Sequence, residues 1–175
     1  MTLEQKIDKA IRNVPDFPKP GIQFKDITPI LENHSLSKEI IESFAKQWEG
    51  KIDAVAGVES RGFLFGFPLA LALDIPFILI RKKGKLPYKT VSYKYDLEYG
   101  SAEIEMHVDT VSTGMRVLVH DDLLATGGTA EAAAELIRKE DGFIAGFSFL
   151  VELGFLNGKE RLEKYSNEIE CLVNY

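Results

Sequence analysis

Apolar residues recur at helical spacing in two segments before residue 50. The first opens with Thr2-Leu-Glu-Gln5, which has the form of a capping box, and apolar positions continue to Val14. The second, residues 35–48, places its apolar residues on one helical face. Three prolines follow the first segment. They fix their own φ angles and disfavour helix before them, so residues 15–30 are expected to be extended or turning.

From residue 53 onward, short apolar runs alternate with longer segments. The runs predict strands at residues 54–58, 77–80, 117–120 and 144–153, and the longer segments predict helices at 61–73 and 129–139. Strands separated by helices form parallel βαβ units, and a period-two alternation over residues 91–105 predicts a hairpin around Tyr99-Gly100. The expected fold is therefore α/β: a parallel twisted sheet flanked by helices, with a hairpin insertion and a small N-terminal hood. Such sheets bind ligands beyond the carboxyl ends of their strands.

Composition narrows the classes of partner. The 175 residues fit one domain, and the net charge of −6 argues against non-specific nucleic-acid binding. The longest apolar stretch, residues 63–80, is interrupted by glycine, proline and aspartate, so no membrane span is expected. The first residues lack the pattern of a signal peptide, and the single Cys171 suits a reducing compartment. These features predict a cytoplasmic protein.

The strongest chemical signal follows the strand predicted at residues 117–120. Asp121-Asp122 leads into a Thr-Gly-Gly-Thr turn and an alanine-rich helix. Glycines let the backbone approach an anion, and the N–H groups and positive dipole of a helix N-terminus bind phosphate. The carboxylates can accept hydrogen bonds from two neighbouring hydroxyls, which a ribose presents. No lysine follows the glycines, so this is not a P-loop for nucleoside triphosphates. An N-capped helix after an ordinary strand is the structural alternative.

Residues 117–129 resemble the phosphoribosyl-pyrophosphate (PRPP) motif of type I phosphoribosyltransferases, in the form found in adenine phosphoribosyltransferases. The resemblance covers residues 15–153. It implies that Asp121 and Asp122 bind the ribose 2′- and 3′-hydroxyls. It also assigns the 5′-phosphate to five loop residues: Ala125, Thr126, Gly127, Gly128 and Thr129.

Val58-Glu-Ser-Arg-Gly-Phe63 also follows a predicted strand. Its turn can present N–H groups to a pyrophosphate, and the planar fork of Arg61 binds phosphate oxygens two at a time. The resemblance implies a pyrophosphate loop made by Glu59, Ser60 and Arg61, with a cis peptide bond between Glu59 and Ser60. The structural alternative is a helix start capped by Ser60.

The basic run at residues 81–87 would by itself be a solvated loop. By resemblance it supplies Arg81 and Lys85 to the pyrophosphate, and residues 82–98 form a mobile lid that excludes water. Leu97-Glu-Tyr-Gly100 closes this region, and Glu98 is the candidate general base for the purine. A solvent-facing glutamate before a hairpin glycine is the alternative for Glu98.

A proline-rich arm, residues 18–29, resembles the family's base-binding segment. The resemblance implies that Phe24 stacks on adenine while the backbones of Gln23 and Lys25 read the edge of the base.

His120 stands where relatives more often have valine or isoleucine. It should face opposite to Asp121, as a core or interface residue.

The resemblance as a whole implies a single domain over residues 1–175, with a hood at about 1–35, a core sheet at about 50–155 and the lid at 82–98. The implied reaction transfers the 5-phosphoribosyl group from PRPP to adenine, with Arg61 and Glu98 as catalytic residues. Mg²⁺ bound with PRPP and a homodimer are further expectations. A transferase for another base is the first alternative. A non-catalytic PRPP or nucleotide sensor is the second, although the chain shows no DNA-binding appendage or basic face.

Overall fold

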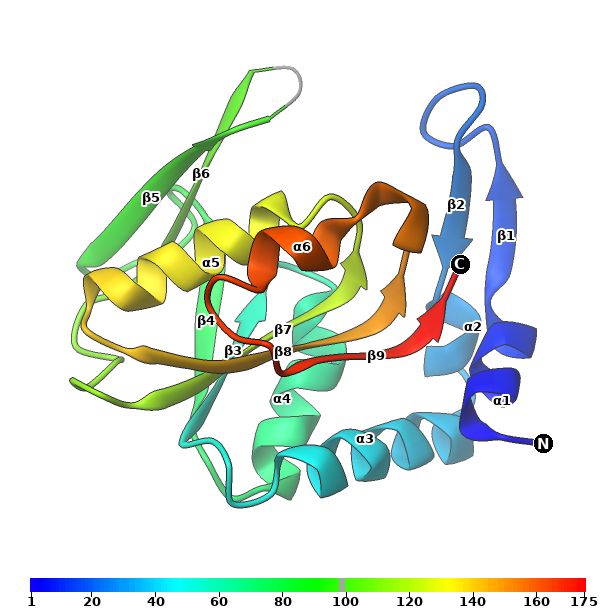
Figure 1. Ribbon diagram of the computed structural model, residues 1–175, viewed down its shortest axis with the longest axis horizontal. Helices are drawn as coiled ribbons and strands as arrows, with labels where there is room; N and C mark the ends of the chain where they lie inside the picture. Colours follow the sequence, from blue (N-terminus) through cyan, green and yellow to red (C-terminus); the bar gives the residue numbers. More distant parts are fainter. Residues whose placement is uncertain (98–99) are drawn as a thin grey trace.

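A seven-stranded sheet forms the centre of the protein. The computed structural model describes residues 1–97 and 100–175, and the strand order is β5-β6-β4-β3-β7-β8-β9 (Figure 1). Five strands run parallel to one another: β4 (Phe77–Lys82), β3 (Ala54–Val58), β7 (Arg116–Leu124), β8 (Phe143–Glu152) and β9 (Ile169–Asn174). β6 (Ser101–His107) pairs antiparallel with β4, and β5 (Thr90–Asp96) with β6. The predicted parallel α/β fold with a hairpin insertion is confirmed.

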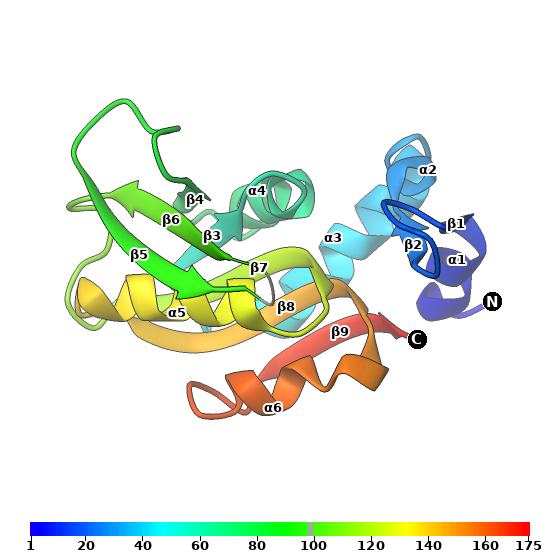
Figure 2. The same cartoon turned by 90° about the horizontal axis from the view of Figure 1, so that it is seen from above.

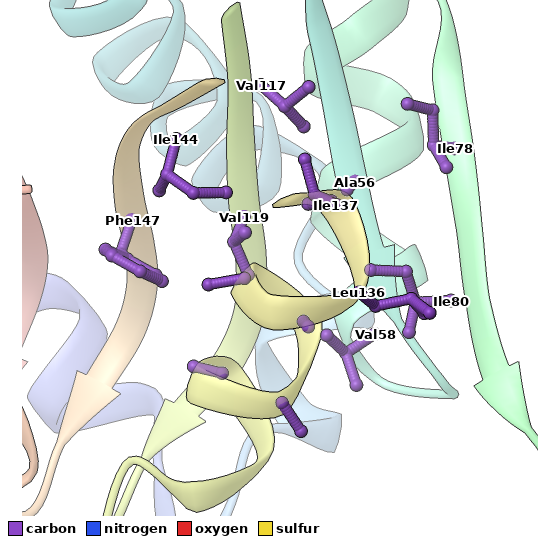
Figure 3. Packing of buried hydrophobic residues seen from close by; sticks show 14 of the residues in the cluster. Ala56, Val58, Ile78, Ile80, Val117, Val119, Leu136, Ile137, Ile144 and Phe147 are labelled. Carbon is purple, nitrogen blue, oxygen red and sulfur yellow. The ribbon is translucent and has the colours of Figure 1, made fainter. Parts of the chain in front are cut away.

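Helices cover both faces of this sheet. α3 (His34–Trp48) and α4 (Gly62–Ala72) lie on one face, and α5 (Gly128–Lys139) and α6 (Gly158–Leu162) on the other (Figure 2). Successive strand residues point to opposite faces of the sheet and pack into two separate apolar cores. Val117 and Val119 pack under α5, while Leu118 packs with the α3 and α4 side chains. Figure 3 shows the first core, where Leu136 and Ile137 of α5 meet the strands. In the described parts of the chain, no helix has the length and apolar character needed to cross a bilayer.

The N-terminal hood departs from its prediction at two places. The capping box of Thr2 and Gln5 is present, but α1 (Leu3–Ala10) ends before Val14. The Arg12–Pro15 segment instead forms β1, which pairs with β2 (Gln23–Asp26). α2 (Thr28–Leu31) was not expected within residues 15–30. Pro29 is compatible with this helix because it stands in the first turn, where a missing N–H costs no hydrogen bond.

β4 and β7 are longer than the apolar runs that predicted them, so polar residues expected after these strands lie within them. β4 continues through Arg81 and Lys82, which pair with β6. β7 continues through Asp121 and Asp122 because β8 accompanies it to Leu124. The expectation that the aspartates follow the strand is therefore wrong. They lie within it, beyond Gly57↔His120, the last residue pair that β7 forms with β3. α6, β9 and the 3-10 helix η1 (Gly154–Leu156) were not predicted.

His120 lies in the core, as its alternation with Asp121 predicted. It is fully buried, its Nδ1 is 2.8 Å from the Ser148 hydroxyl, and its ring meets Phe44 edge-on. Its Nε2 has no hydrogen-bond partner among residues 1–97 and 100–175. Burial lowers the pKa of His120 from 6.5 to about 3, so the imidazole is neutral in the folded protein.

Replacing this pair in the variant His120→Val/Ser148→Ala should flatten the dependence of stability on pH. A histidine with a depressed folded pKa stabilises fully above pH 6.5, and that stability is lost as pH falls toward 3. Between pH 7 and pH 5, the wild type should lose about 2 kcal/mol more unfolding free energy than the variant. Urea unfolding at both pH values measures this. Parallel losses in the two proteins would show that His120 does not titrate as described.

Candidate active site

A cavity of about 400 Å³ is lined by the ends of β3 and β4 and by Asp121 and Asp122 of β7. It brings together residues from three separate predicted motifs, as expected for the carboxyl edge of a parallel sheet. The predicted site residues that line it are Glu59, Ser60, Arg61, Arg81, Asp121, Asp122 and Thr129. A second cavity of about 210 Å³ shares Arg61, both aspartates and Thr129, and adds residues 123–128 and Ala130. The two hollows therefore form one continuous site.

The two aspartates form the polar floor of this site. Asp121 Oδ1 accepts the N–H of Asp122 at 2.8 Å and lies against Gly62 at the start of α4. Burial and the neighbouring Asp122 carboxylate raise the pKa of Asp121 well above its ordinary value. Burial also raises the pKa of Asp122, and the charge of Arg61 offsets part of that rise. Two adjacent carboxylates with raised pKa values at a cavity are candidates for binding a ligand that donates hydrogen bonds.

Arg61 connects the aspartates with the hood. Its Nε is 3.1 Å from Asp122 Oδ2, and its guanidinium carbon is 5.2 Å from the centre of the Phe24 ring. Phe24 also meets Phe17 edge-on at 5.1 Å. The aromatic surface of the arm and the carboxylate pair are thus neighbours, separated by one guanidinium group.

The loop at residues 125–129 has the geometry of an anion site. Gly127 has φ of 81°, a left-handed conformation that favours glycine, and α5 begins at the next residue. Among residues 1–97 and 100–175, no side chain caps the first turn of α5, and Gly128, Thr129 and Ala130 of this turn line the smaller cavity. The N–H groups of an uncapped helix start are available to an anion. Glu131 in this turn is paired with Lys164 at 2.6 Å and Arg161 at 3.5 Å. Its negative charge near the loop is therefore largely offset.

Two of the predicted pyrophosphate residues, Glu59 and Arg81, form an ion pair with each other. The Glu59–Ser60 peptide bond is cis, which confirms that prediction. Glu59 binds the Arg81 guanidinium through both carboxylate oxygens, at 3.1 and 3.2 Å, and also accepts the N–H of Lys82 at 2.9 Å. The hydrogen bonds from Arg81 hold the pKa of Glu59 below its ordinary value. Lys85 is not among the residues that line either cavity, although its carbonyl accepts a hydrogen bond from Arg81 at 3.2 Å.

The arm presents Phe24 and turns the Lys25 side chain elsewhere. Lys25 Nζ binds Asn13 Oδ1 at 2.7 Å and lies 3.5 Å from the centre of the Tyr175 ring. Among the described strands, β2 pairs with β1 alone, so the backbone of Gln23 and Lys25 lies on a strand with a free edge. The base-reading role of these backbones stays a prediction.

Tyr95 and Arg161, at or next to the site, were not predicted from the sequence. Tyr95 of the β5–β6 hairpin lines the larger cavity, with its hydroxyl 3.5 Å from the Thr129 hydroxyl. Arg161 of α6 lies against Gly128, so close that a methyl group there would be 3.0 Å from its Nη1. No local pattern marks either residue, because each reaches the site by tertiary packing. Glu98 lies outside the described residues.

Comparison with known proteins gives a consistent result. The family model described as "Phosphoribosyl transferase domain" matches residues 25–174. The chain is 55% identical over 174 residues to an adenine phosphoribosyltransferase of Cytophaga hutchinsonii, covering 99% of this chain and 96% of the relative. It superposes on the crystal structure of an adenine phosphoribosyltransferase from Thermoanaerobacter pseudethanolicus with a TM-score of 0.94, at 48% identity over 99% and 100% of the two chains. The Saccharomyces cerevisiae adenine phosphoribosyltransferase, crystallised with adenine and an imino-altritol bisphosphate, gives a TM-score of 0.91 at 38% identity over 97% and 98%.

Proposed function

The chain belongs to the adenine phosphoribosyltransferase family, and from this membership we propose how its own residues share the reaction. The protein transfers the 5-phosphoribosyl group of PRPP to adenine, which gives AMP and pyrophosphate in purine salvage. The observation that carries the assignment of residues is the continuous site described above. In it an anion-binding loop and a carboxylate pair line the two cavities at one edge of the sheet, and the Phe24 ring lies beside them, across the Arg61 guanidinium.

The order of these features matches the order of groups in the product. The 5′-phosphate binds the N–H groups of residues 125–129 at the start of α5, and the ribose hydroxyls donate to Asp121 and Asp122. Adenine stacks on Phe24, next to Arg61, which then contacts both the base and the ribose site. The backbones of Gln23 and Lys25 read the edge of the base.

The chemical step replaces the bond from C1′ to pyrophosphate oxygen with a bond from C1′ to adenine N9, through an oxocarbenium-like transition state. Pyrophosphate leaves with the bonding electrons, and the purine ring gives up the N9 proton. Glu98 is the proposed acceptor of that proton. The carboxylates of Asp121 and Asp122 hold the ribose and face the positive charge that develops on it. Glu59, Ser60, Arg61, Arg81 and Lys85 form the proposed pyrophosphate side of the site, which residues 82–98 cover as a lid.

Mg²⁺ bound with PRPP is part of this proposal. Residues 1–97 and 100–175 contain no cluster of three or more metal-ligating side chains that would form a protein cage for the ion. The Asp121 and Asp122 carboxylates at the cavity fit an ion carried mainly on PRPP and ribose oxygens. When bound, Mg²⁺ neutralises charge on the departing pyrophosphate.

Purified protein incubated with PRPP, Mg²⁺ and one base at a time tests the activity and base choice. Nucleotide formation is followed by chromatography, with reactions lacking PRPP as blanks. AMP from adenine, and no product from hypoxanthine, guanine, xanthine or orotate, is expected. Another nucleotide would overturn the base assignment. PRPP binding without any product would favour the sensor alternative.

We also propose that the protein works in the cytoplasm as a homodimer. α4 is apolar on every side, yet the apolar side chains on its outer face are exposed to solvent. Phe67 is 50% and Leu71 65% exposed, and Leu64 lies on the same face. A helix that is apolar all round is normally buried, and a second copy would bury this face. The chain has a single cysteine, Cys171, and so forms no internal disulfide, which fits a reducing compartment.

Leu71→Asp should therefore convert the dimer to monomers. A charge at the buried centre of an interface loses its hydration and gains no partner. The free-energy cost of this desolvation exceeds the binding free energy that a typical interface contact contributes. Sedimentation velocity measures the change. The control is Phe155→Asp, which alters an equally exposed apolar residue on η1 and should leave the dimer intact. A monomeric wild type would remove the proposal.

A further inference from the structure

The carboxylate of Glu105 is one buried acidic group that the reaction described above does not use. Glu105 lies on β6 opposite Arg81 of β4, and the residue is only 2% exposed. Its Oε1 accepts three consecutive backbone N–H groups, from Gly84, Lys85 and Leu86, each at 3.0 Å. Its Oε2 is 3.9 Å from Lys83 Nζ. One carboxylate thus binds three consecutive backbone N–H groups of the turn that follows β4.

This arrangement suits a group that remains ionised although it is buried. Burial alone would raise the pKa of Glu105, but the N–H groups of residues 84–86 and the Thr90 side chain outweigh it, and the pKa stays below its ordinary value. Charge-assisted bonds to backbone N–H groups are stronger than neutral ones, and three of them fix the path of a short loop.

The loop that Glu105 holds joins residues proposed to face the leaving pyrophosphate. Lys85 is one of the three donors, and its carbonyl also accepts the Arg81 guanidinium, which in turn binds Glu59. A chain of contacts therefore runs from Glu105 through the turn to Arg81 and the pyrophosphate loop. Without the carboxylate, three adjacent N–H groups would lose their acceptor and would have to bond to water, and the turn could then adopt other conformations.

We propose that Glu105 is a positioning residue for pyrophosphate: its carboxylate holds the 83–86 turn so that Lys85 and Arg81 are placed to bind the pyrophosphate group of PRPP. Glu105 itself touches no substrate. This inference rests on the proposed placement of pyrophosphate, and it predicts an effect on PRPP that adenine binding does not share.

The test compares Glu105→Ala and Glu105→Gln with Glu103→Gln. Glu103 is the matched control because it lies on the same strand and also approaches Lys83. Its side chain is 36% exposed and, among the described residues, accepts no backbone N–H from the turn. Glu105→Ala should raise KM for PRPP roughly 10- to 100-fold and weaken product inhibition by pyrophosphate to a similar extent, because it removes charge-assisted hydrogen bonds. Glu105→Gln keeps one acceptor oxygen and should restore part of this loss. KM for adenine at saturating PRPP should change less than about twofold, as expected for a site the loop does not touch.

The proposal is overturned if KM for PRPP and pyrophosphate inhibition match the wild type in both variants. It is also overturned if KM for both substrates rises together, because that pattern marks a general structural role. Glu105→Gln keeps the size of the side chain and serves where Glu105→Ala does not fold. If the wild type makes no AMP, the proposed function fails first, and the result is distinguishable from any effect of Glu105.

Discussion

Asp121→Asn should produce a protein that melts at a higher temperature and has lost most of its activity. The amide keeps the acceptor for the Asp122 N–H but removes a negative charge from an enclosed position. A carboxyl with a raised folded pKa stabilises fully below its unfolded value near 3.8, and that stability is lost as pH rises through the window above it. The melting temperature gained by the variant should therefore be largest near neutral pH and vanish as pH approaches 3.8.

The same substitution should lower kcat/KM for PRPP on the order of 10²-fold. An amide accepts a weaker hydrogen bond from a ribose hydroxyl and places no negative charge beside the developing oxocarbenium ion. Steady-state kinetics and thermal melts on one preparation measure both effects. The control is Asp53→Asn, which removes an exposed carboxylate paired with Arg116 and should leave activity unchanged without raising the melting temperature. A variant that is active, or that is less stable at neutral pH, would contradict the role given to Asp121.

Much of the fold could be predicted because several strands of the core sheet contain a short apolar run with polar or turn residues on either side. Residues 54–58 match β3 at both ends, and the predicted helix at 35–48 differs from α3 by one residue. These elements lie in the core, where hydrophobic periodicity and burial agree. The phosphate loop could also be recognised, since glycines before a helix have a local geometric reason that sequence alone displays.

The remaining features depend on partners distant in sequence. The length of β7 is set by β8, so the position of Asp121 within a strand could not be read from residues 117–122. The pairing of Arg81 with Glu59 requires two strands to be adjacent and parallel. β9 was missed because it is an edge strand with mostly half-buried residues, which gives little contrast between apolar and polar positions.

The approach of α6 to the phosphate loop is another such feature, and it leads to the second large effect. A methyl group on Gly158 would be 2.3 Å from the Ala125 carbonyl oxygen and 2.9 Å from Leu124 Cδ1. A methyl group on Gly127 would in turn be 2.7 Å from the Gly158 carbonyl oxygen. The shortest of these contacts are to backbone atoms, so the two backbones are packed directly on each other and no side-chain movement would relieve the overlap.

Gly158→Ala should consequently displace the phosphate loop. Overpacking of this kind costs about 1–3 kcal/mol of unfolding free energy, and the loop is the part free to shift because its outer side faces the cavity. KM for PRPP should rise about tenfold or more, since N–H groups that move by a fraction of an ångström no longer converge on one phosphate. Gly50→Ala is the control: the added methyl meets open space, and the positive φ of 72° costs about 1–2 kcal/mol without touching the site. Equal destabilisation of the two variants with a changed KM only in Gly158→Ala would assign to α6 the task of fixing the phosphate site. An unchanged KM in both would mean that the loop holds its shape independently of α6.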